Sequence, residues 1–147
     1  MTVGHARGGS LLTALSDAGA RVTEPRRAVA ALIGAQDGHF TTAQLLTAAR
    51  LEYPGLGRAT IFRALDLFTS LGFVERMDLP GGGHAWVACE TAHHHHAICT
   101  RCGRSTEVDD HGLADVLASV AGRSGFRVTT HRLEVFGTCA SCLAATA

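Results

Sequence analysis

The sequence lacks the features that would place it in a membrane or outside the cell. None of its apolar runs approaches the ~20 residues of a membrane-spanning helix, and its first residues do not combine a charged start with an apolar run and a cleavage site. We therefore expect a soluble, cytoplasmic protein with no membrane partner. In that compartment the five cysteines are normally reduced, which favours metal binding over disulfides.

Lysine is also absent, so all 13 basic residues are arginine, and they balance 13 acidic residues. Residues 1–76 contain 8 arginines and 6 acidic residues, whereas residues 77–147 contain 5 and 7. This difference suggests two modules, but it is too small to indicate nucleic-acid binding by itself. Arginine binds phosphate or guanine through two parallel hydrogen bonds, yet genome composition explains the bias equally well.

The front half has the pattern of a helical domain with a hairpin. Apolar spacing and cap residues predict helices after a loose arm at residues 1–9. The expected helices cover residues 10–19, 24–33, 42–52 and 58–72. Two strand-like runs joined by Pro-Gly-Gly-Gly then predict a hairpin at residues 73–89. The last three of these helices, followed by a hairpin, have the order of a winged helix-turn-helix. We assign this domain to residues 1–83 and place the domain boundary near residues 83–89.

The back half, residues 84–147, has a mixed pattern. Strands are expected at residues 92–99, 105–108 and 127–139, and a helix at residues 110–122. The whole chain, of which 46% of residues are apolar, is therefore predicted to be an α+β protein with two small domains.

Two Cys-x-x-Cys motifs, Cys99–Cys102 and Cys139–Cys142, are the most specific feature of the sequence. Zn²⁺ prefers four soft ligands in a tetrahedron with Zn–S distances of about 2.3 Å, and each motif supplies two thiolates from one turn. A redox pair and free thiols are the alternatives, but two motifs that each follow a strand favour structural zinc. Zinc bound there would join the last strand of the back half to its first and provide much of that domain's folding free energy.

Residues 93–96, just before the first of these motifs, are all histidine. On a strand, the odd-numbered side chains point to one face and the even-numbered ones to the other, so the run can serve two metal sites. A solvated loop is the alternative. Cys89, the fifth cysteine, is either a small core residue or a soft ligand beside these imidazoles, in a mixture of donors that suits Zn²⁺.

With these motifs, the sequence resembles the ferric uptake regulator family, and most of all its zinc-sensing branch. The resemblance lies in GRATIFRALDLFTSLGFVERM, HHHHAICTRCGRSTEV and HRLEVFGTCASC, together with ARVTEPRRAV near the start, and covers nearly the whole chain. It implies a homodimer in which each chain has an N-terminal winged helix and a C-terminal α/β dimerisation domain. It also implies a structural zinc bound by Cys99, Cys102, Cys139 and Cys142.

Two further metal sites are implied by the resemblance. The sensing site corresponds to Glu75, Cys89, His94 and His96. Metal bound there would connect the hairpin and hinge to the dimerisation domain and so favour the DNA-binding arrangement. The third site corresponds to His93, His95 and His131. The family's fourth ligand at this site, a glutamate, falls on Ala114, so that Asp115 or water would have to complete the site.

A rival assignment of the regulatory metal uses nitrogen and oxygen ligands only. His39 and Glu107 match ligands of iron and peroxide sensors, and together with His94 and His96 they would form a site for Fe²⁺, Mn²⁺ or Ni²⁺. Cys89 favours Zn²⁺ as the regulatory ion, so we expect zinc in both the structural and the regulatory role.

Residues 59–70 match the recognition helix of the family, whose first turns meet bases and phosphates in the major groove. Phe62 replaces a tyrosine that packs on a thymine methyl group, and Arg63 is expected to contact guanine or phosphate. Arg58 and Thr60 are expected to contact phosphate, and Arg21 and Arg26 to approach the backbone or minor groove. A two-fold dimer predicts a palindromic, AT-rich operator.

The resulting hypothesis is a non-enzymatic, zinc-responsive repressor of transcription whose only small ligand is a metal ion. An iron, manganese, nickel or peroxide sensor is the alternative within the family. A zinc hydrolase or deaminase would need a glutamate two residues after a ligand histidine, and the histidine run has none. A structural module stapled by zinc is a further alternative, which metal-dependent DNA binding would exclude.

Overall fold

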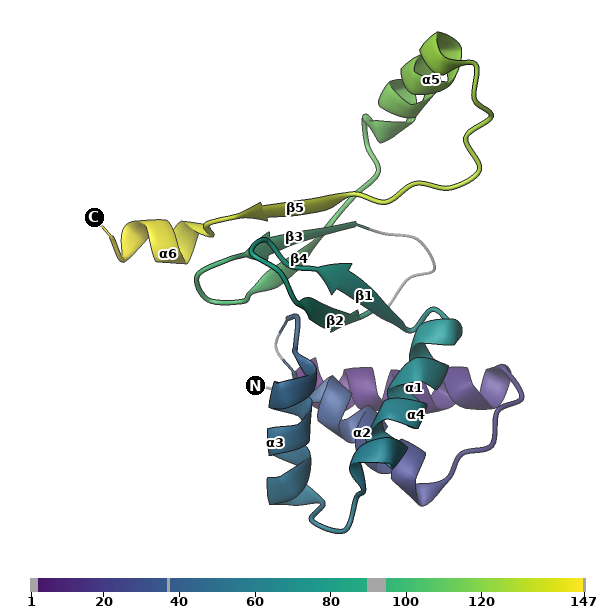
Figure 1. The fold of residues 1–147 in the computed structure, drawn as a ribbon, viewed down its shortest axis with the longest axis vertical. Coiled ribbons are helices and arrows are strands. Elements are labelled where there is room, and N and C mark those ends of the chain that lie inside the picture. The colour runs from purple at the N-terminus through teal and green to yellow at the C-terminus, as the bar shows by residue number, and fades with distance from the viewer. Residues whose placement is uncertain (1–2, 37, 90–94, 147) are drawn as a thin grey trace. The chain divides into compact units, whose positions relative to one another are not determined.

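The computed structural model describes residues 3–36, 38–89 and 95–146 of the chain. The chain divides into two compact units, residues 1–92 and 93–147, and each is described by itself. The N-terminal unit contains α1 (Val3–Asp17), α2 (Glu24–Gly34), α3 (Thr42–Glu52), α4 (Arg58–Ser70), β1 (Val74–Asp78) and β2 (His84–Ala88) (Figure 1). The C-terminal unit contains β3 (His95–Cys99), β4 (Ser105–Val108), α5 (Leu113–Ser124), β5 (Glu134–Gly137) and α6 (Ala140–Ala144).

Local signals in the sequence account for the starts of α2 and α3. The Thr23 side chain accepts a hydrogen bond from the Arg26 backbone N–H at 3.5 Å, and a proline follows in the first turn of α2. At α3, Thr41 and Gln44 form a capping box, in which each side chain accepts a hydrogen bond from the other residue's backbone N–H, at 3.2 and 2.8 Å. These bonds satisfy backbone donors that have no partner inside the helix.

The expectation of a loose arm at residues 1–9 was wrong, because α1 begins at Val3. Leu11 and Leu15 of this helix are buried in the core of the N-terminal unit. Once that apolar turn is fixed, extension toward the N-terminus adds one hydrogen bond per ordered residue. The core itself is formed by apolar residues from all four helices, from β1 and from the segment before α3: Leu11, Leu15, Val29, Ala30, Leu32, Ile33, Phe40, Leu45, Ala49, Ile61, Ala64, Leu65, Phe68 and Val74.

The hairpin of β1 and β2 forms the wing of a winged helix-turn-helix. The two strands are antiparallel, with Val74 opposite Ala88 and Asp78 opposite His84. The glycines of the tip, residues 81–83, all have positive φ angles, which explains why the turn is made of glycine. Phe40, just before α3, exchanges two backbone hydrogen bonds of 2.8 Å with Trp86 and so ties the wing to the helical part of the unit.

A three-stranded sheet in the order β4-β3-β5 organises the C-terminal unit. β3 is antiparallel to β4 and parallel to β5, so Cys99 at the end of β3 lies opposite Gly137 at the end of β5. The predicted strand at residues 127–139 is shorter than expected, because only Glu134–Gly137 pairs with β3. The short helix α6, which contains the second Cys-x-x-Cys motif, was not expected.

The division between the units falls after residue 92 and not after residue 83. The reason is that β2 pairs with β1, and its residues Trp86 and Ala88 pack against the core of the N-terminal unit. None of the helices in the described part of the chain is long and apolar enough to cross a membrane.

Candidate functional site

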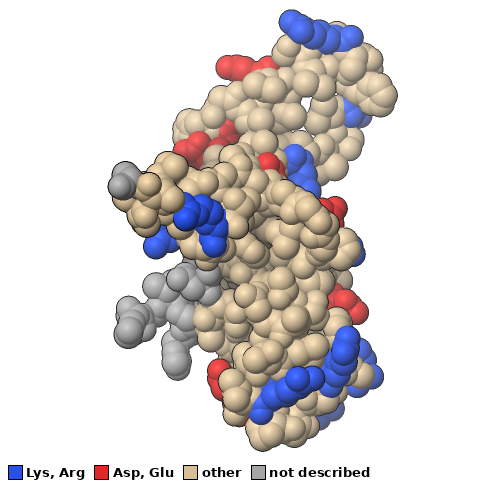
Figure 2. Space-filling model, turned by 60° about the vertical axis from the view of Figure 1, so that its left-hand side comes forward, with Lys and Arg blue, Asp and Glu red and all other residues tan. Residues whose placement is uncertain are grey.

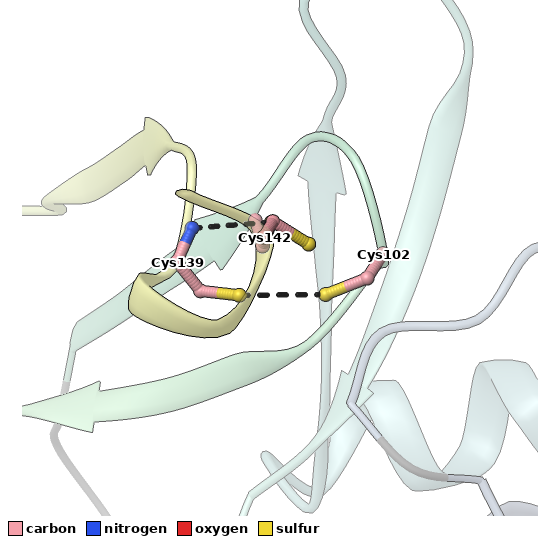
Figure 3. Close-up of side chains that lie close together, drawn as sticks. Cys102, Cys139 and Cys142 are labelled. Carbon is pink, nitrogen blue, oxygen red and sulfur yellow. Dashed lines mark hydrogen bonds between the residues drawn. The ribbon is translucent and has the colours of Figure 1, made fainter. Parts of the chain in front are cut away.

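The four cysteines of the two motifs come together in the C-terminal unit. Cys99 ends β3, Cys102 lies in the turn that follows, Cys139 caps α6 and Cys142 lies within it. Their sulfur atoms are all within 4.8 Å of one another. The Cys102 and Cys139 sulfurs face each other at 3.7 Å (Figure 3). Tetrahedral zinc with Zn–S bonds of about 2.3 Å requires sulfurs about 3.8 Å apart, so the cluster has the dimensions of a zinc site.

The thiols of this cluster differ in their pKa values. The Cys139 backbone N–H donates to the Cys99 sulfur at 3.3 Å, and this bond, followed by one from the Cys102 backbone, lowers the pKa of Cys99 to about 6. The adjacent Cys139 and Cys102 side chains raise the pKa of Cys142 to about 12. The cluster therefore binds one proton tightly while another site ionises readily. Zn²⁺ would replace the retained proton and balance the thiolate charge.

A second group of ligand atoms lies in the same unit. The side chain of His95, which is 2% exposed, points from β3 to Asp110, with Nε2 and Oδ1 2.7 Å apart. His131, in the irregular segment before β5, places its Nε2 atom 3.2 Å from the same His95 nitrogen. The structure thus brings together two of the three histidines expected at the third metal site. The other, His93, lies outside the described residues.

The carboxylate in this group differs from the expectation. Asp115 lies in the first turn of α5 and is exposed, as is Ala114, and neither belongs to the group of ligand atoms around His95. Asp110 belongs to it instead, a residue that no sequence pattern singled out. A usable signal was strand register: His95 is opposite Val108, the last residue of β4, so the first acidic residues after β4 come close to His95.

In the N-terminal unit, the expected sensing residues Glu75 and Cys89 lie side by side on the wing. A Glu75 carboxylate oxygen and the Cys89 sulfur are within 4.8 Å of each other. The Cys89 backbone N–H donates to the Phe73 carbonyl at 2.9 Å, and its thiol donates to the Val87 carbonyl at 3.6 Å. In the C-terminal unit, His96 is buried, with an exposure of 3%. His94 lies outside the described residues.

The residues of the rival site come from both units of the chain. His39 lies just before α3 in the N-terminal unit, where its Nδ1 atom is buried and makes no hydrogen bond within the described part of the chain. Glu107 is exposed on β4, opposite His96. A buried ring nitrogen without a hydrogen bond is unusual, so the Nδ1 atom of His39 is available to a ligand.

The polar residues expected to contact DNA lie on the first turns of α4. The Arg58 guanidinium carbon is 5.4 Å from the centre of the Phe62 ring, and Arg63 donates to the Thr60 hydroxyl at 3.3 Å. The opposite side of α4 is buried, so the helix is held by its apolar face and presents these side chains outward. On α2, Arg26 donates to the Arg21 carbonyl at 2.6 Å. Figure 2 shows several arginines close together on the lower surface, over the N-terminal unit.

A winged helix joined to a unit with a zinc-type cysteine cluster defines a metal-binding regulator of the winged-helix class. A sequence profile of the ferric uptake regulator family matches residues 17–136. The chain belongs to this family, and thus to the metal-responsive transcription regulators. This confirms the family expected from the sequence and the α+β fold of winged helix and second domain.

Individual relatives match a similar share of the chain, but their names refer to different metals. The chain is 33% identical to the ferric uptake regulation protein of Legionella pneumophila over 87% of its own length and 95% of that protein. It is 34% identical to the zinc uptake regulation protein of Mycobacterium tuberculosis over 87% and 98%. A zinc uptake regulator solved with zinc and DNA superposes with a TM-score of 0.77 at 27% identity, covering 99% of both chains. Similarity of this degree to both kinds of regulator leaves the metal to be argued from the residues.

Proposed function

We propose that this regulator is a zinc-responsive repressor that binds palindromic operator DNA as a homodimer. One observation carries the choice of metal: a thiol, Cys89, lies within 4.8 Å of the Glu75 carboxylate on the wing. Thiolate ligands select Zn²⁺ over Fe²⁺ and Mn²⁺, which prefer nitrogen and oxygen. The similarity to zinc uptake regulators supports the same choice.

In this proposal the sensing site is completed by His94 and His96, which the alternation of side chains expected for a strand would place on one face. The site would then take two ligands from the wing and two from the start of the C-terminal unit. Zinc binds all four only when the two units adopt a compatible arrangement, so it shifts the population toward that arrangement. If that arrangement is the one that fits the operator, zinc acts as corepressor.

The C-terminal unit would provide the dimer contacts, in addition to the structural zinc on its four cysteines. Large apolar side chains are exposed on this unit: Val116, Val120, Phe126, Val128, Val135 and Leu143. A helix such as α5, which has no buried residue, needs another surface to cover its apolar side. A second copy of the chain is the partner that the family implies, and a two-fold dimer reads a palindrome.

For DNA recognition we propose that α4 enters the major groove. Phe62 would contact a thymine methyl group and Arg63 a guanine or phosphate, while Arg58 and Thr60 would bind phosphate. Arg26 would contact the backbone. The neighbouring rings and hydroxyls already hold Arg58 and Arg63 near the start of α4, which lowers the entropy cost of these contacts.

The test is a DNA-binding titration against buffered free Zn²⁺, with a palindromic operator from the protein's own promoter region. Wild type, Cys89→Ser and Glu75→Gln are compared, each with its four-cysteine zinc retained. We expect wild type to bind at low free zinc, and Cys89→Ser to need at least about tenfold more, since a thiolate ligand is lost. An equal response of wild type and Cys89→Ser would contradict the proposal.

The buried Nδ1 atom of His39 favours a second candidate, an iron or manganese sensor that uses His39 and Glu107 with His94 and His96. The same titration with Fe²⁺ and Mn²⁺, on wild type and His39→Ala, separates the two. In the zinc sensor, His39→Ala leaves the zinc response unchanged, whereas in the second candidate it abolishes the response to Fe²⁺ or Mn²⁺.

A further inference from the structure

Two arginine side chains join the two Cys-x-x-Cys motifs. Arg101 lies inside the first motif, and its guanidinium donates to the carbonyl of Cys142, in the second motif, at 3.0 Å. Arg104 lies two residues after the first motif and donates to the hydroxyl of Ser141, inside the second motif, at 3.2 Å. Both side chains therefore tie the turn after β3 to α6, and we call the pair the arginine clamp.

The charges of the two segments that contain the motifs are all positive. Residues 97–106 and 135–147 contain no aspartate or glutamate, and their basic residues are Arg101 and Arg104. Residues 107–134, between these segments, contain five acidic residues and three arginines. Four thiolates around one Zn²⁺ leave two negative charges in excess. The two guanidinium groups of the clamp supply the opposite charge at the motifs themselves.

Arg101 acts on the cluster through its backbone as well as its side chain. The pKa of Cys99 is lowered to about 6, first by the backbone N–H of Cys139 and next by that of Cys102. The backbone N–H of Arg101 lowers it further. One residue of the first motif thus stabilises a thiolate of its own motif and binds the backbone of the second, at Cys142.

We propose that Arg101 and Arg104 retain the four-cysteine zinc, because their charges offset that of the tetrathiolate and their bonds hold the two motifs together. Release of the ion begins when one thiolate detaches and takes up a proton. Positive charge nearby favours the thiolate over the thiol, so a detached sulfur rebinds the metal more often. Groups that orient metal ligands change metal affinity in the same way.

The arginine clamp rests on the proposed function and deepens it. A zinc sensor with a structural zinc must keep that ion at free-zinc concentrations at which its sensing site empties. Two sites for one metal must therefore differ in how readily they release it. The clamp contributes to this difference, since its two arginines bind the motifs of the structural site.

The experiment measures the rate at which zinc passes from the loaded full chain to an excess of a chromogenic chelator. The parent is Cys89→Ser, which removes the sensing site, and the slowest zinc equivalent is followed. We expect the double variant Arg101→Gln, Arg104→Gln to release it at least about tenfold faster than the parent, and each single variant to show a smaller increase. Hydrogen exchange of β3 checks that each loaded variant is folded.

The matched control is Arg123→Gln, which removes the same charge from the same unit. Arg123 lies in the last turn of α5 and, among the described residues, is bonded to neither motif. It should release zinc at the parent's rate. Arg101→Lys separates charge from packing: lysine keeps the charge, whereas glutamine keeps only a hydrogen-bond donor. We expect Arg101→Lys to release zinc more slowly than Arg101→Gln.

Salt gives a readout that a purely structural role would not change. A rise from about 0.1 to about 1 M shortens the Debye length from ~10 to ~3 Å, so it should speed release from the parent more than from the double variant. The clamp is overturned if the double variant matches the parent, if Arg123→Gln is equally fast, or if Arg101→Lys and Arg101→Gln do not differ.

Cys102→Ser distinguishes a failure of the clamp from a failure of the zinc site beneath it. This variant should lack the slow equivalent altogether, because a ligand is lost. If it lacks the equivalent while the arginine variants match the parent, only the clamp is overturned. If it keeps the equivalent, the four cysteines do not hold the structural zinc, and that part of the proposed function fails with the clamp.

Discussion

The two units of this protein bury their side chains very differently. In the N-terminal unit, apolar residues from four helices and the wing form a continuous core. In the described part of the C-terminal unit, the buried residues are Ile98, Cys99 and two histidines. With one exception, Leu51, the large apolar residues that are exposed also belong to the C-terminal unit. The first unit thus has the apolar burial that drives folding, whereas we infer that the second is stabilised by metal ions and by a partner that covers its exposed apolar surface.

Removal of a zinc ligand is expected to have the largest effect, because it should destabilise one unit and leave the other folded. Structural zinc contributes an apparent ~10–16 kcal/mol in small zinc domains, more than the total stability of most domains. Cys102→Ser should therefore unfold the C-terminal unit while the N-terminal unit stays folded. Hydrogen exchange resolved by residue measures both units in one experiment, and Cys89→Ser is the control with an intact four-cysteine cluster. Loss of protection in both units, or in neither, would show that the two units do not differ in their dependence on zinc.

A cavity in the core of the N-terminal unit should instead destabilise that unit and leave the C-terminal unit intact. Phe68 is fully buried on α4, and truncation of a buried phenylalanine costs about 3–5 kcal/mol. We expect Phe68→Ala to destabilise the N-terminal unit and weaken operator binding, with the zinc content of the cysteine cluster unchanged. Thermal unfolding and metal analysis measure the two effects. A loss of structural zinc in this variant would show that the units are not independent.

A charge on α5 tests whether the exposed apolar surface is covered by a second chain. Val120 is 49% exposed, and we expect Val120→Asp to weaken the dimer by at least about tenfold, or ~1.4 kcal/mol, because the charge would be buried at the interface. Sedimentation over a range of concentrations measures the dissociation constant. Leu51→Asp is the matched control, since Leu51 is 79% exposed on the N-terminal unit; equal weakening by both substitutions would argue against α5 as the contact.

The same contrast explains which parts of the structure could be predicted from the sequence. The helices of the N-terminal unit follow from apolar periodicity and from caps such as Thr41, which are signals within a few residues. The cysteine ligands follow from their spacing within each motif. Both kinds of signal are local, so they can be recognised without knowledge of the rest of the fold.

The features that were missed depend on contacts between distant segments. Asp110 reaches His95 through the register of β4 on β3 and the turn before α5, which no local pattern specifies. β5 is shorter than its alternating pattern, because strand length is set by the partner, and β3 pairs with only Glu134–Gly137. Likewise α1 extends further than its apolar residues indicate, because packing on its C-terminal part stabilises the whole helix.

A helix cap gives the smallest and most local test. The capping box of Thr41 and Gln44 fixes the start of α3, whereas α5 begins after Gly112, which has a positive φ of 83° and no side-chain cap. We expect Thr41→Ala to lower the free energy of unfolding of the N-terminal unit by about 1 kcal/mol, measured by urea denaturation. Thr42→Ala, one residue further, removes no cap and is the control. α5 lies in the other unit and has no such cap, so Thr41→Ala should leave the stability of the C-terminal unit unchanged. A loss of stability in that unit would mean that α5 depends on the N-terminal unit.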